Sequence, residues 1–160
     1  MTVEQGLNPD FLDLLLQFRR NGVEFVVVGA HALAAHGIPR ATGDLDVFVR
    51  PDKANAAKVV AALAAFGAPL AQHQVTEVDF ARPGNVYQLG LPPRRIDVLT
   101  SISGVDFTAA WSGRIELAVA GGPIAFLGRA ELVQNKTAAA RPKDLLDVQR
   151  LLELEQLKAH

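Results

Sequence analysis

Apolar and polar positions along the chain follow two periods, and their alternation predicts helices and strands in turn. Near the N-terminus apolar residues recur at helical spacing after the capping sequence Asn8-Pro9-Asp10. Further on, short and wholly apolar runs predict buried strands, each followed by a helical segment. The predicted elements of the first half are a helix ending at Asn21-Gly22, a strand over 25–28, a helix over 31–36, a strand over 45–49 and a helix over 53–66.

The second half of the chain is richer in strand-like segments separated by Gly, Pro and Asn. Its last thirty residues return to helical spacing, with an expected buried face of Leu145, Leu146, Val148, Leu151 and Leu152. The pattern therefore predicts an α/β (α+β) fold with a small mixed sheet flanked by helices. Residues 1–128 would form the core, and 129–160 a C-terminal helical segment packed on it. The predicted elements are strands over 75–80, 86–89, 95–99, 115–119 and 124–127, then helices over 130–140 and 143–157.

Composition narrows the classes of function. The 160 residues are 49% hydrophobic, which is enough for one domain with a substantial core. The 16 basic and 17 acidic residues nearly cancel, so RNA contact would need local groups such as Arg94, Arg95, Arg141 and Lys143. The absence of cysteine excludes disulfides and thiolate sites. With no signal-peptide pattern and no apolar run of about 20 residues, we expect a cytoplasmic protein that does not enter a membrane.

Two aspartates, Asp44 and Asp46, mark the entrance of the second predicted strand. Side chains at positions i and i+2 of a strand point to the same face, so both carboxylates would project together. Adjacent carboxylates repel each other, and a cation between them removes that repulsion. The pair therefore predicts a site for a hard metal ion such as Mg²⁺, although acids at a strand entrance are also commonly just solvated.

Gly29-Ala30 follows the first predicted strand and opens a helix. A turn of small residues lets an anion approach the unpaired N–H groups of the helix start, so we predict a phosphate contact there. A dinucleotide-binding turn would need glycines where the chain has His31 and Ala34. His31 and His36 also lack the spacing of a zinc-protease pair. An ordinary strand-to-helix turn remains an alternative for this pair taken alone.

A third acid, Asp97, lies in the strand predicted over 95–99. It could complete a metal site and accept a proton, or it could be a surface acid paired with Arg94 or Arg95. Arg40, on the approach to the acid pair, and Lys136, near the last helix junction, are candidate phosphate cations. Solvated surface positions are the alternative for both.

The order of these motifs resembles that of the polymerase-beta-like nucleotidyltransferase superfamily. Gly29-Ala30, Asp44-Leu45-Asp46 and Asp97 match its turn, its paired acids and its third acid, in order and in strand context. The stretches 28–46 and 136–147 look especially like small bacterial members, the abortive-infection (type IV toxin–antitoxin) nucleotidyltransferase toxins. One departure is Ala30, where the family has serine or glycine. Alanine keeps the backbone N–H but lends no hydroxyl to a phosphate.

The resemblance implies nucleotidyl transfer from a nucleoside triphosphate such as ATP to an acceptor hydroxyl. Two Mg²⁺ ions would be held by Asp44, Asp46 and Asp97, with Asp97 as the base. The acceptor would be a transfer RNA or a partner protein, and a cognate antitoxin is a possible partner. The alternatives are transfer to a small antibiotic, and a degenerate partner-binding module that kept only the fold. The triphosphate would be bound by Gly29, Ala30, Arg40 and Lys136.

Overall fold

The structure, a computed structural model, describes residues 7–40 and 43–159, in which six strands form one mixed sheet and seven helices surround it. The strands are β1 (Phe25–Val28), β2 (Leu45–Val49), β3 (Val86–Leu89), β4 (Ile96–Leu99), β5 (Ile115–Val119) and β6 (Gly122–Phe126). The helices are α1 (Pro9–Arg20), α2 (Gly29–Ala35), α3 (Lys53–Phe66), α4 (Glu77–Phe80), α5 (Phe107–Ser112), α6 (Arg129–Ala139) and α7 (Pro142–Ala159).

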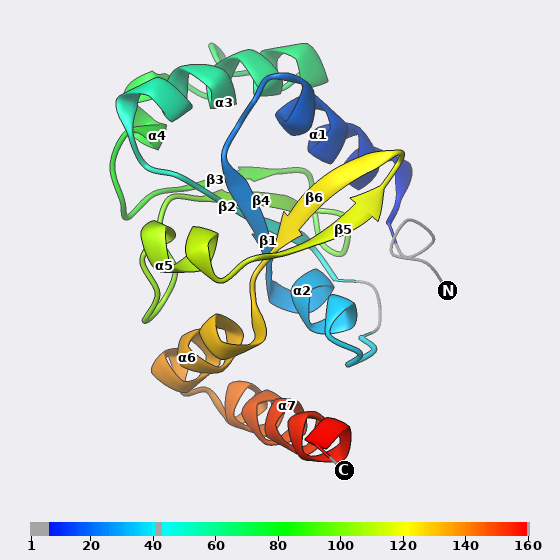
Figure 1. The fold of residues 1–160 in the computed structure, drawn as a ribbon. Coiled ribbons are helices and arrows are strands. Elements are labelled where there is room, and N and C mark those ends of the chain that lie inside the picture. Colours follow the sequence, from blue (N-terminus) through cyan, green and yellow to red (C-terminus); the bar gives the residue numbers. More distant parts are fainter. Residues whose placement is uncertain (1–6, 41–42, 160) are drawn as a thin grey trace.

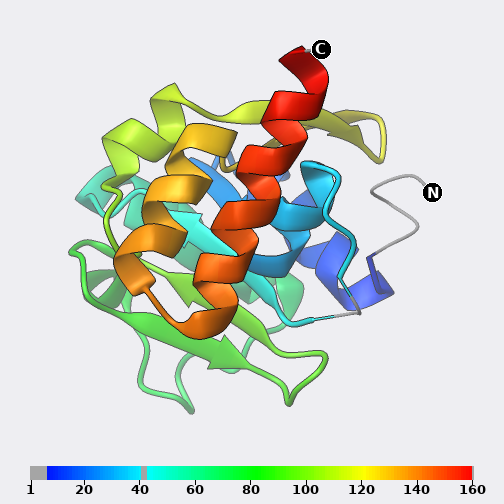
Figure 2. The same ribbon diagram turned by 90° about the horizontal axis from the view of Figure 1, so that it is seen from below.

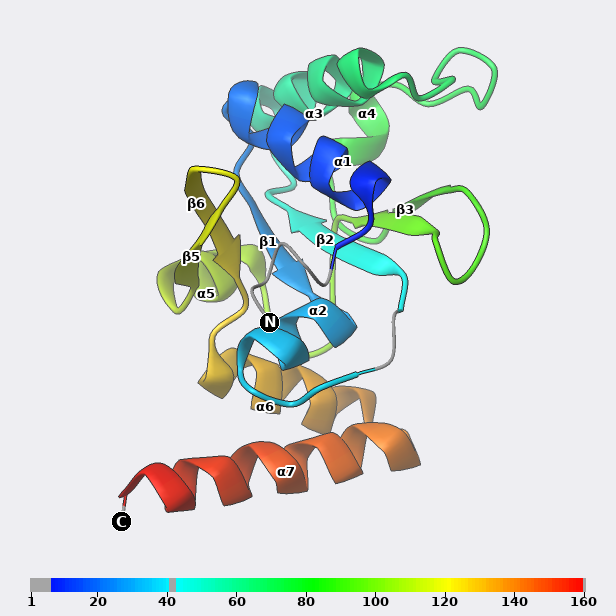
Figure 3. The same cartoon turned by 90° about the vertical axis from the view of Figure 1, so that its right-hand side faces the viewer.

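The strand order is β3-β4-β2-β1-β6-β5. At its centre β2 runs antiparallel to β1 and parallel to β4. Helices α1, α3 and α4 cover one face, and α2, α5, α6 and α7 lie on the other, with α7 outermost (Figures 1 and 3). Seen from below, α6 and α7 run side by side across that second face (Figure 2). The predicted mixed sheet flanked by helices is confirmed.

Alternation along β2 divides the core into two clusters. Val47 packs with α1 and α3, whereas Phe48 packs with α5 on the opposite face of the sheet. Phe48 and Phe107 meet edge to face, with ring centroids 5.1 Å apart. Asp46 shares the face of Phe48, because it lies two residues earlier in the strand. The sheet therefore directs this carboxylate toward the layer that holds α2, α6 and α7.

The strand predicted over 75–80 is wrong, because Glu77–Phe80 form the helical turn α4 instead. Thr76 and Asp79 make a capping box, in which the Thr76 backbone N–H donates to Asp79 Oδ2 at 2.8 Å. Phe80 packs edge to face on Tyr87, at 6.2 Å between ring centroids, while Val78 stays 55% exposed. The alternating apolar residues suggested a strand, but the local cap and the burial of a single ring favoured a helical turn.

The predicted apolar face of α7 is also wrong in part. Leu151 is buried, but Leu145, Leu146 and Leu152 are each between 44% and 50% exposed. The inward face instead carries two fully buried carboxylates, described with the candidate site below. No helix in the part of the chain that the structure describes is long and apolar enough to cross a membrane.

Asn55, in the first turn of α3, ties the approach to β1 to the end of β2. Its buried amide donates to the carbonyl oxygens of Glu24 and Arg50, both at 3.0 Å, and accepts from the Glu24 N–H at 2.8 Å. Asp52 caps the same turn by accepting from the Asn55 N–H at 2.7 Å. One side chain thereby satisfies three backbone groups where two central strands meet their connections.

We expect Asn55→Ala to lower the free energy of unfolding by about 2 kcal/mol, because the Glu24 N–H loses its partner and the carbonyl oxygens of Glu24 and Arg50 each lose one of two. Urea denaturation measures the change. Lys58→Ala, an exposed substitution on the same helix, is the control and should stay within about 0.5 kcal/mol of wild type. An Asn55→Ala loss no larger than that of the control would contradict the bridging role.

Candidate functional site

Two of the three predicted acids face each other at the centre of the sheet. The parallel register of β2 and β4 pairs Asp46 with Asp97. Asp44 lies just before β2, and its Oδ1 accepts the backbone N–H of Arg95, just before β4, at 3.0 Å. Asp97 is only 8% exposed, so its face of the sheet is covered rather than open to solvent. The structure therefore brings the three acids together at one end of the β2–β4 pair.

The turn between β1 and α2 comes directly against this acid cluster. Helix α2 begins at Gly29, two residues earlier than predicted. A Cβ at position 29 would lie 2.5 Å from Asp46 Oδ2, and the φ of +68° also favours glycine. Val28, the cap residue, has no side chain that can accept a hydrogen bond from the helix start. A ligand bound to the backbone of 29–30 would thus adjoin the Asp46 carboxylate.

The crowding of acids changes the protonation of Asp46. Burial is the largest cause that raises its pKa to about 7, followed by the charge and hydrogen bond of Asp97 and the charge of Asp44. The positive charge of Arg95 acts in the opposite direction. Asp46 therefore lacks sufficient counter-charge in this arrangement, and an added cation would favour its ionised form.

Arg95 supplies positive charge to the acid cluster. Its Nε donates to Asp97 Oδ1 at 2.9 Å, and its Nη2 to Asp97 Oδ2 at 3.3 Å. The same Nη2 lies 3.4 Å from Asp44 Oδ2. The sequence-based alternative in which Asp97 pairs with Arg95 thus describes a real contact, but not a surface one, because the pair belongs to the acid cluster.

The residues present fit Mg²⁺ by type. Carboxylate oxygens are the protein ligands that Mg²⁺ prefers, and Asp44, Asp46 and Asp97 supply them from one place. Within residues 7–40 and 43–159, however, no group of three or more acids or histidines is already arranged to hold a metal ion. Two of these carboxylates are turned to Arg95 instead. An ion bound by this set would therefore lie against the Arg95 guanidinium.

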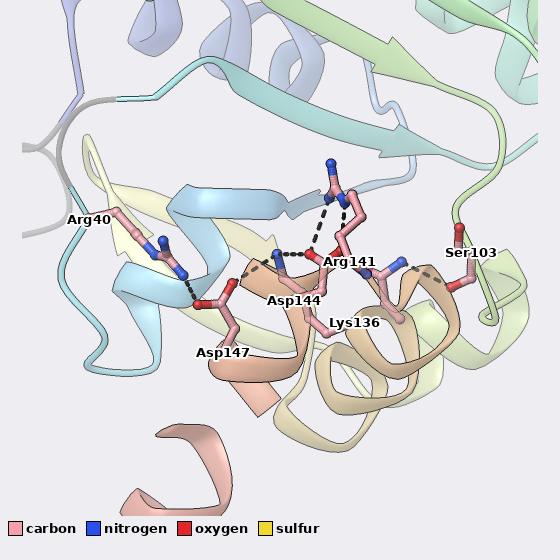
Figure 4. Close-up of polar contacts among 7 residues, drawn as sticks. Arg40, Ser103, Lys136, Arg141, Asp144 and Asp147 are labelled. Carbon is pink, nitrogen blue, oxygen red and sulfur yellow. Dashed lines mark hydrogen bonds and ion pairs between the residues drawn. The ribbon is translucent and has the colours of Figure 1, made fainter. Parts of the chain in front are cut away.

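The two candidate phosphate cations lie in a second cluster, at the junction of α6 and α7 (Figure 4). Lys136 Nζ lies 3.3 Å from Asp144 Oδ1 and 3.3 Å from Asp147 Oδ2. Arg40 pairs with Asp147, and Arg141 Nε donates to Asp144 Oδ2 at 2.6 Å. The structure thus brings Arg40 and Lys136 together, although the anions that they contact belong to α7.

Both carboxylates of this cluster are almost completely buried, at 0% and 1% exposure for Asp144 and Asp147. Burial lowers the pKa of Lys136, and its hydrogen bond to Asp144 acts in the opposite direction. Burial would raise the pKa of Asp144, but the hydrogen bonds from Arg141 and Lys136 outweigh it and lower that pKa. The cluster therefore consists of two buried carboxylates and a buried lysine, with the more exposed Arg40 and Arg141 as further partners.

Sequence reasoning missed these two acids as site candidates. Their i, i+3 spacing places them on one helix face, a signal available in the sequence. It was masked by the neighbouring leucines, which suggested a purely apolar face. His31 and His36, excluded as a zinc pair, bond to backbone instead, His31 Nε2 to Gly43 O at 3.2 Å and His36 Nε2 to Leu127 O at 2.8 Å.

Comparison with known proteins supports the fold. No protein-family model matches the sequence, and a search of curated proteins finds no match. Among solved structures, the "putative nucleotidyltransferase (TM1012)" from Thermotoga maritima matches with a TM-score of 0.51 and 15% identity, over 91% of this chain and 86% of that one. An "antigenic nucleotidyltransferase-like protein" from Paracoccidioides brasiliensis matches with a TM-score of 0.50 and 15% identity, over 94% and 78%. The chain therefore has a nucleotidyltransferase-like fold.

We expect Asp46→Asn to stabilise the metal-free protein. The pKa of Asp46 is about 7 in the folded state and 3.8 ordinarily, so between pH 3.8 and pH 7 the folded state binds more protons than the unfolded state. Wild-type stability therefore falls as the pH rises through this range. The advantage of Asn should be absent below pH 4, grow up to pH 7 and then level off at roughly 1–2 kcal/mol, allowing for solvent screening. Urea denaturation in EDTA from pH 4 to 8 measures it. A difference independent of pH would contradict the prediction.

We expect Lys136→Ala to lower the free energy of unfolding by about 3 kcal/mol, because two buried carboxylates lose a shared cation. Lys143→Ala is the matched control, since Lys143 is exposed at the same helix junction and should change stability by less than about 0.5 kcal/mol. Thermal and urea denaturation measure both. Equal stability of the two variants would show that Lys136 is not needed by the buried acids.

Proposed function

We propose that this chain is a Mg²⁺-dependent nucleotidyltransferase, which transfers a nucleotidyl group from a nucleoside triphosphate to a hydroxyl of an RNA or protein acceptor. The observation that carries the proposal is the pairing of Asp46 with Asp97 across β2 and β4, with the backbone of Gly29 against the Asp46 carboxylate. This pairing supports a set of oxygen ligands for Mg²⁺ beside backbone N–H groups that would receive phosphate. The nucleotidyltransferase-like fold adds support at the level of architecture.

Each residue of the acid cluster and of the turn has a proposed role. Asp44, Asp46 and Asp97 would hold two Mg²⁺ ions, which when bound would supply positive charge to the phosphate oxygens. The N–H groups of Gly29 and Ala30 would bind the triphosphate. The acceptor oxygen forms a bond to the α-phosphorus, its proton passes to Asp97, the bond from that phosphorus to the bridging oxygen breaks, and pyrophosphate leaves.

Arg40 and Lys136 would contribute positive charge to the outer phosphates. In the structure both cations are engaged by acids of α7, so triphosphate would have to share or replace those contacts. The clustering of the two cations beside the helix junction supports this role.

The acceptor is proposed from sequence resemblance alone. Similarity to abortive-infection toxins favours a transfer RNA end, or a partner protein, in a cytoplasmic toxin–antitoxin system. Arg94 and Arg141 are exposed basic groups that could contact an RNA backbone. For an RNA acceptor, labelling should therefore fall steeply with salt concentration, and for a protein acceptor it should depend on salt less.

The test is incubation of the chain with Mg²⁺, each nucleoside triphosphate labelled at the α- or the γ-phosphate, and total cellular RNA or protein. We expect α-label to become attached to an acceptor and γ-label to leave as pyrophosphate. Asp46→Asn and Asp97→Asn should each lower transfer at least about 100-fold, as removal of a charge-stabilising group typically does. Asp13→Asn, at an exposed position of α1, should keep wild-type activity.

Transfer of γ-label would contradict the proposal, since it would indicate phosphoryl transfer. Full activity of Asp46→Asn would contradict the site. The second candidate function, a partner-binding module without catalysis, is favoured by Ala30 and by the contacts of Arg95 with two of the acids. It predicts no label on any acceptor and no dependence of acceptor binding on Mg²⁺.

A further inference from the structure

Arg95 lies in the acid cluster but has no role in the proposed chemistry. Four contacts fix it there, one from its backbone N–H and three from its guanidinium. The guanidinium engages both oxygens of Asp97, which is the geometry of a strong charge-assisted pair. It also reaches Asp44, so that a single side chain joins the first and the third acid.

A divalent ion and this guanidinium compete for the same oxygens. Both oxygens of Asp97 and Oδ2 of Asp44 already face Nε and Nη2 of Arg95, so an ion bound by Asp97 and Asp44 would have to share those oxygens with the guanidinium. Two positive groups on the same oxygens would also repel each other at short range. The ion brings two charges in place of one, and it could also bind Asp46, to which the guanidinium donates no hydrogen bond.

The surroundings of Arg95 allow an exchange. Its side chain is 29% exposed, against 12% for that of Asp97, so the guanidinium already borders solvent into which it can turn. The backbone N–H of Arg95 holds Asp44 independently of the side chain. The acid cluster would therefore keep much of its shape when the guanidinium turns outward.

We propose that Arg95 is the resident counter-ion of the acid cluster, that a divalent cation must displace it, and that it thereby sets the cation concentration at which the site fills. The inference rests on the proposed function for the role of the three acids. The displaced guanidinium is left beside the site, where a triphosphate can pair with it. Nucleotide binding would then favour displacement, and Arg95 would couple metal binding to nucleotide binding.

The test is Mn²⁺ binding by isothermal titration, with and without a non-hydrolysable nucleoside triphosphate analogue. Arg95→Gln should bind Mn²⁺ about tenfold more tightly than wild type without nucleotide, the equivalent of one charged hydrogen bond. Its gain in Mn²⁺ affinity on adding nucleotide should be smaller than that of wild type. Arg82→Gln, at an exposed position outside the acid cluster, is the control and should resemble wild type in both respects.

Two further variants serve as controls for the Mn²⁺-binding experiment. Arg95→Lys keeps a charge but cannot bridge two carboxylates in the same way, so its Mn²⁺ affinity should lie between those of wild type and Arg95→Gln. Arg95→Lys also replaces Arg95→Gln as the test variant if Arg95→Gln does not fold. The double variant Arg95→Gln with Asp46→Asn should lose the gain in affinity, which locates the ion at the acid cluster.

The outcomes separate this inference from the function on which it rests. Equal or weaker Mn²⁺ binding by Arg95→Gln, in a wild-type chain that transfers α-label, would overturn the counter-ion role and leave the transferase standing. Absence of Mn²⁺ binding from both wild type and Arg95→Gln, together with absence of transfer, would overturn both. Tighter binding in Arg95→Gln with an unchanged effect of nucleotide would overturn the coupling role.

Discussion

Three carboxylates held at one end of the β2–β4 pair are the constraint on which the local structure depends. Like charges brought together in a covered place must be neutralised, separated or protonated. This molecule does the first through Arg95, and it raises the pKa of Asp46 to about 7 where that charge does not suffice. Close packing of the acids also leaves no space for a side chain at Gly29. The clustered carboxylates that suggest catalysis thus also lower the stability of the fold without a ligand.

Most of the fold could be predicted because its signals are local. Helix α3 spans Lys53–Phe66 as expected, since Asp52 caps its start and Gly67, in the left-handed region, ends it. The buried strands β1 and β2 are short apolar runs with few alternative interpretations. The strand predicted over 75–80 was wrong because six residues show too little periodicity to distinguish a strand from a helix. The cap at Thr76 favours the helical turn.

The candidate site could be predicted only as far as local geometry extends. The shared face of Asp44 and Asp46 follows from the period of a strand. The approach of Gly29 to Asp46 does not, because it depends on the antiparallel register of β1 and β2. The burial of Asp144 and Asp147 on α7 could not be predicted either. The cations that compensate their buried charges, Lys136 and Arg40, come from other segments of the chain.

The inward charges of α7 have a consequence for how well its position is defined. An apolar helix face can slide by a turn along its neighbour and still bury similar area, so several registers remain close in free energy. Asp144 and Asp147 permit no such shift, because each must meet Lys136 and an arginine at fixed places. A one-turn displacement of about 5.4 Å would strand both carboxylates. The ion pairs therefore fix the position of α7 along its neighbour. A helix face made only of leucines would pack in several positions of similar free energy.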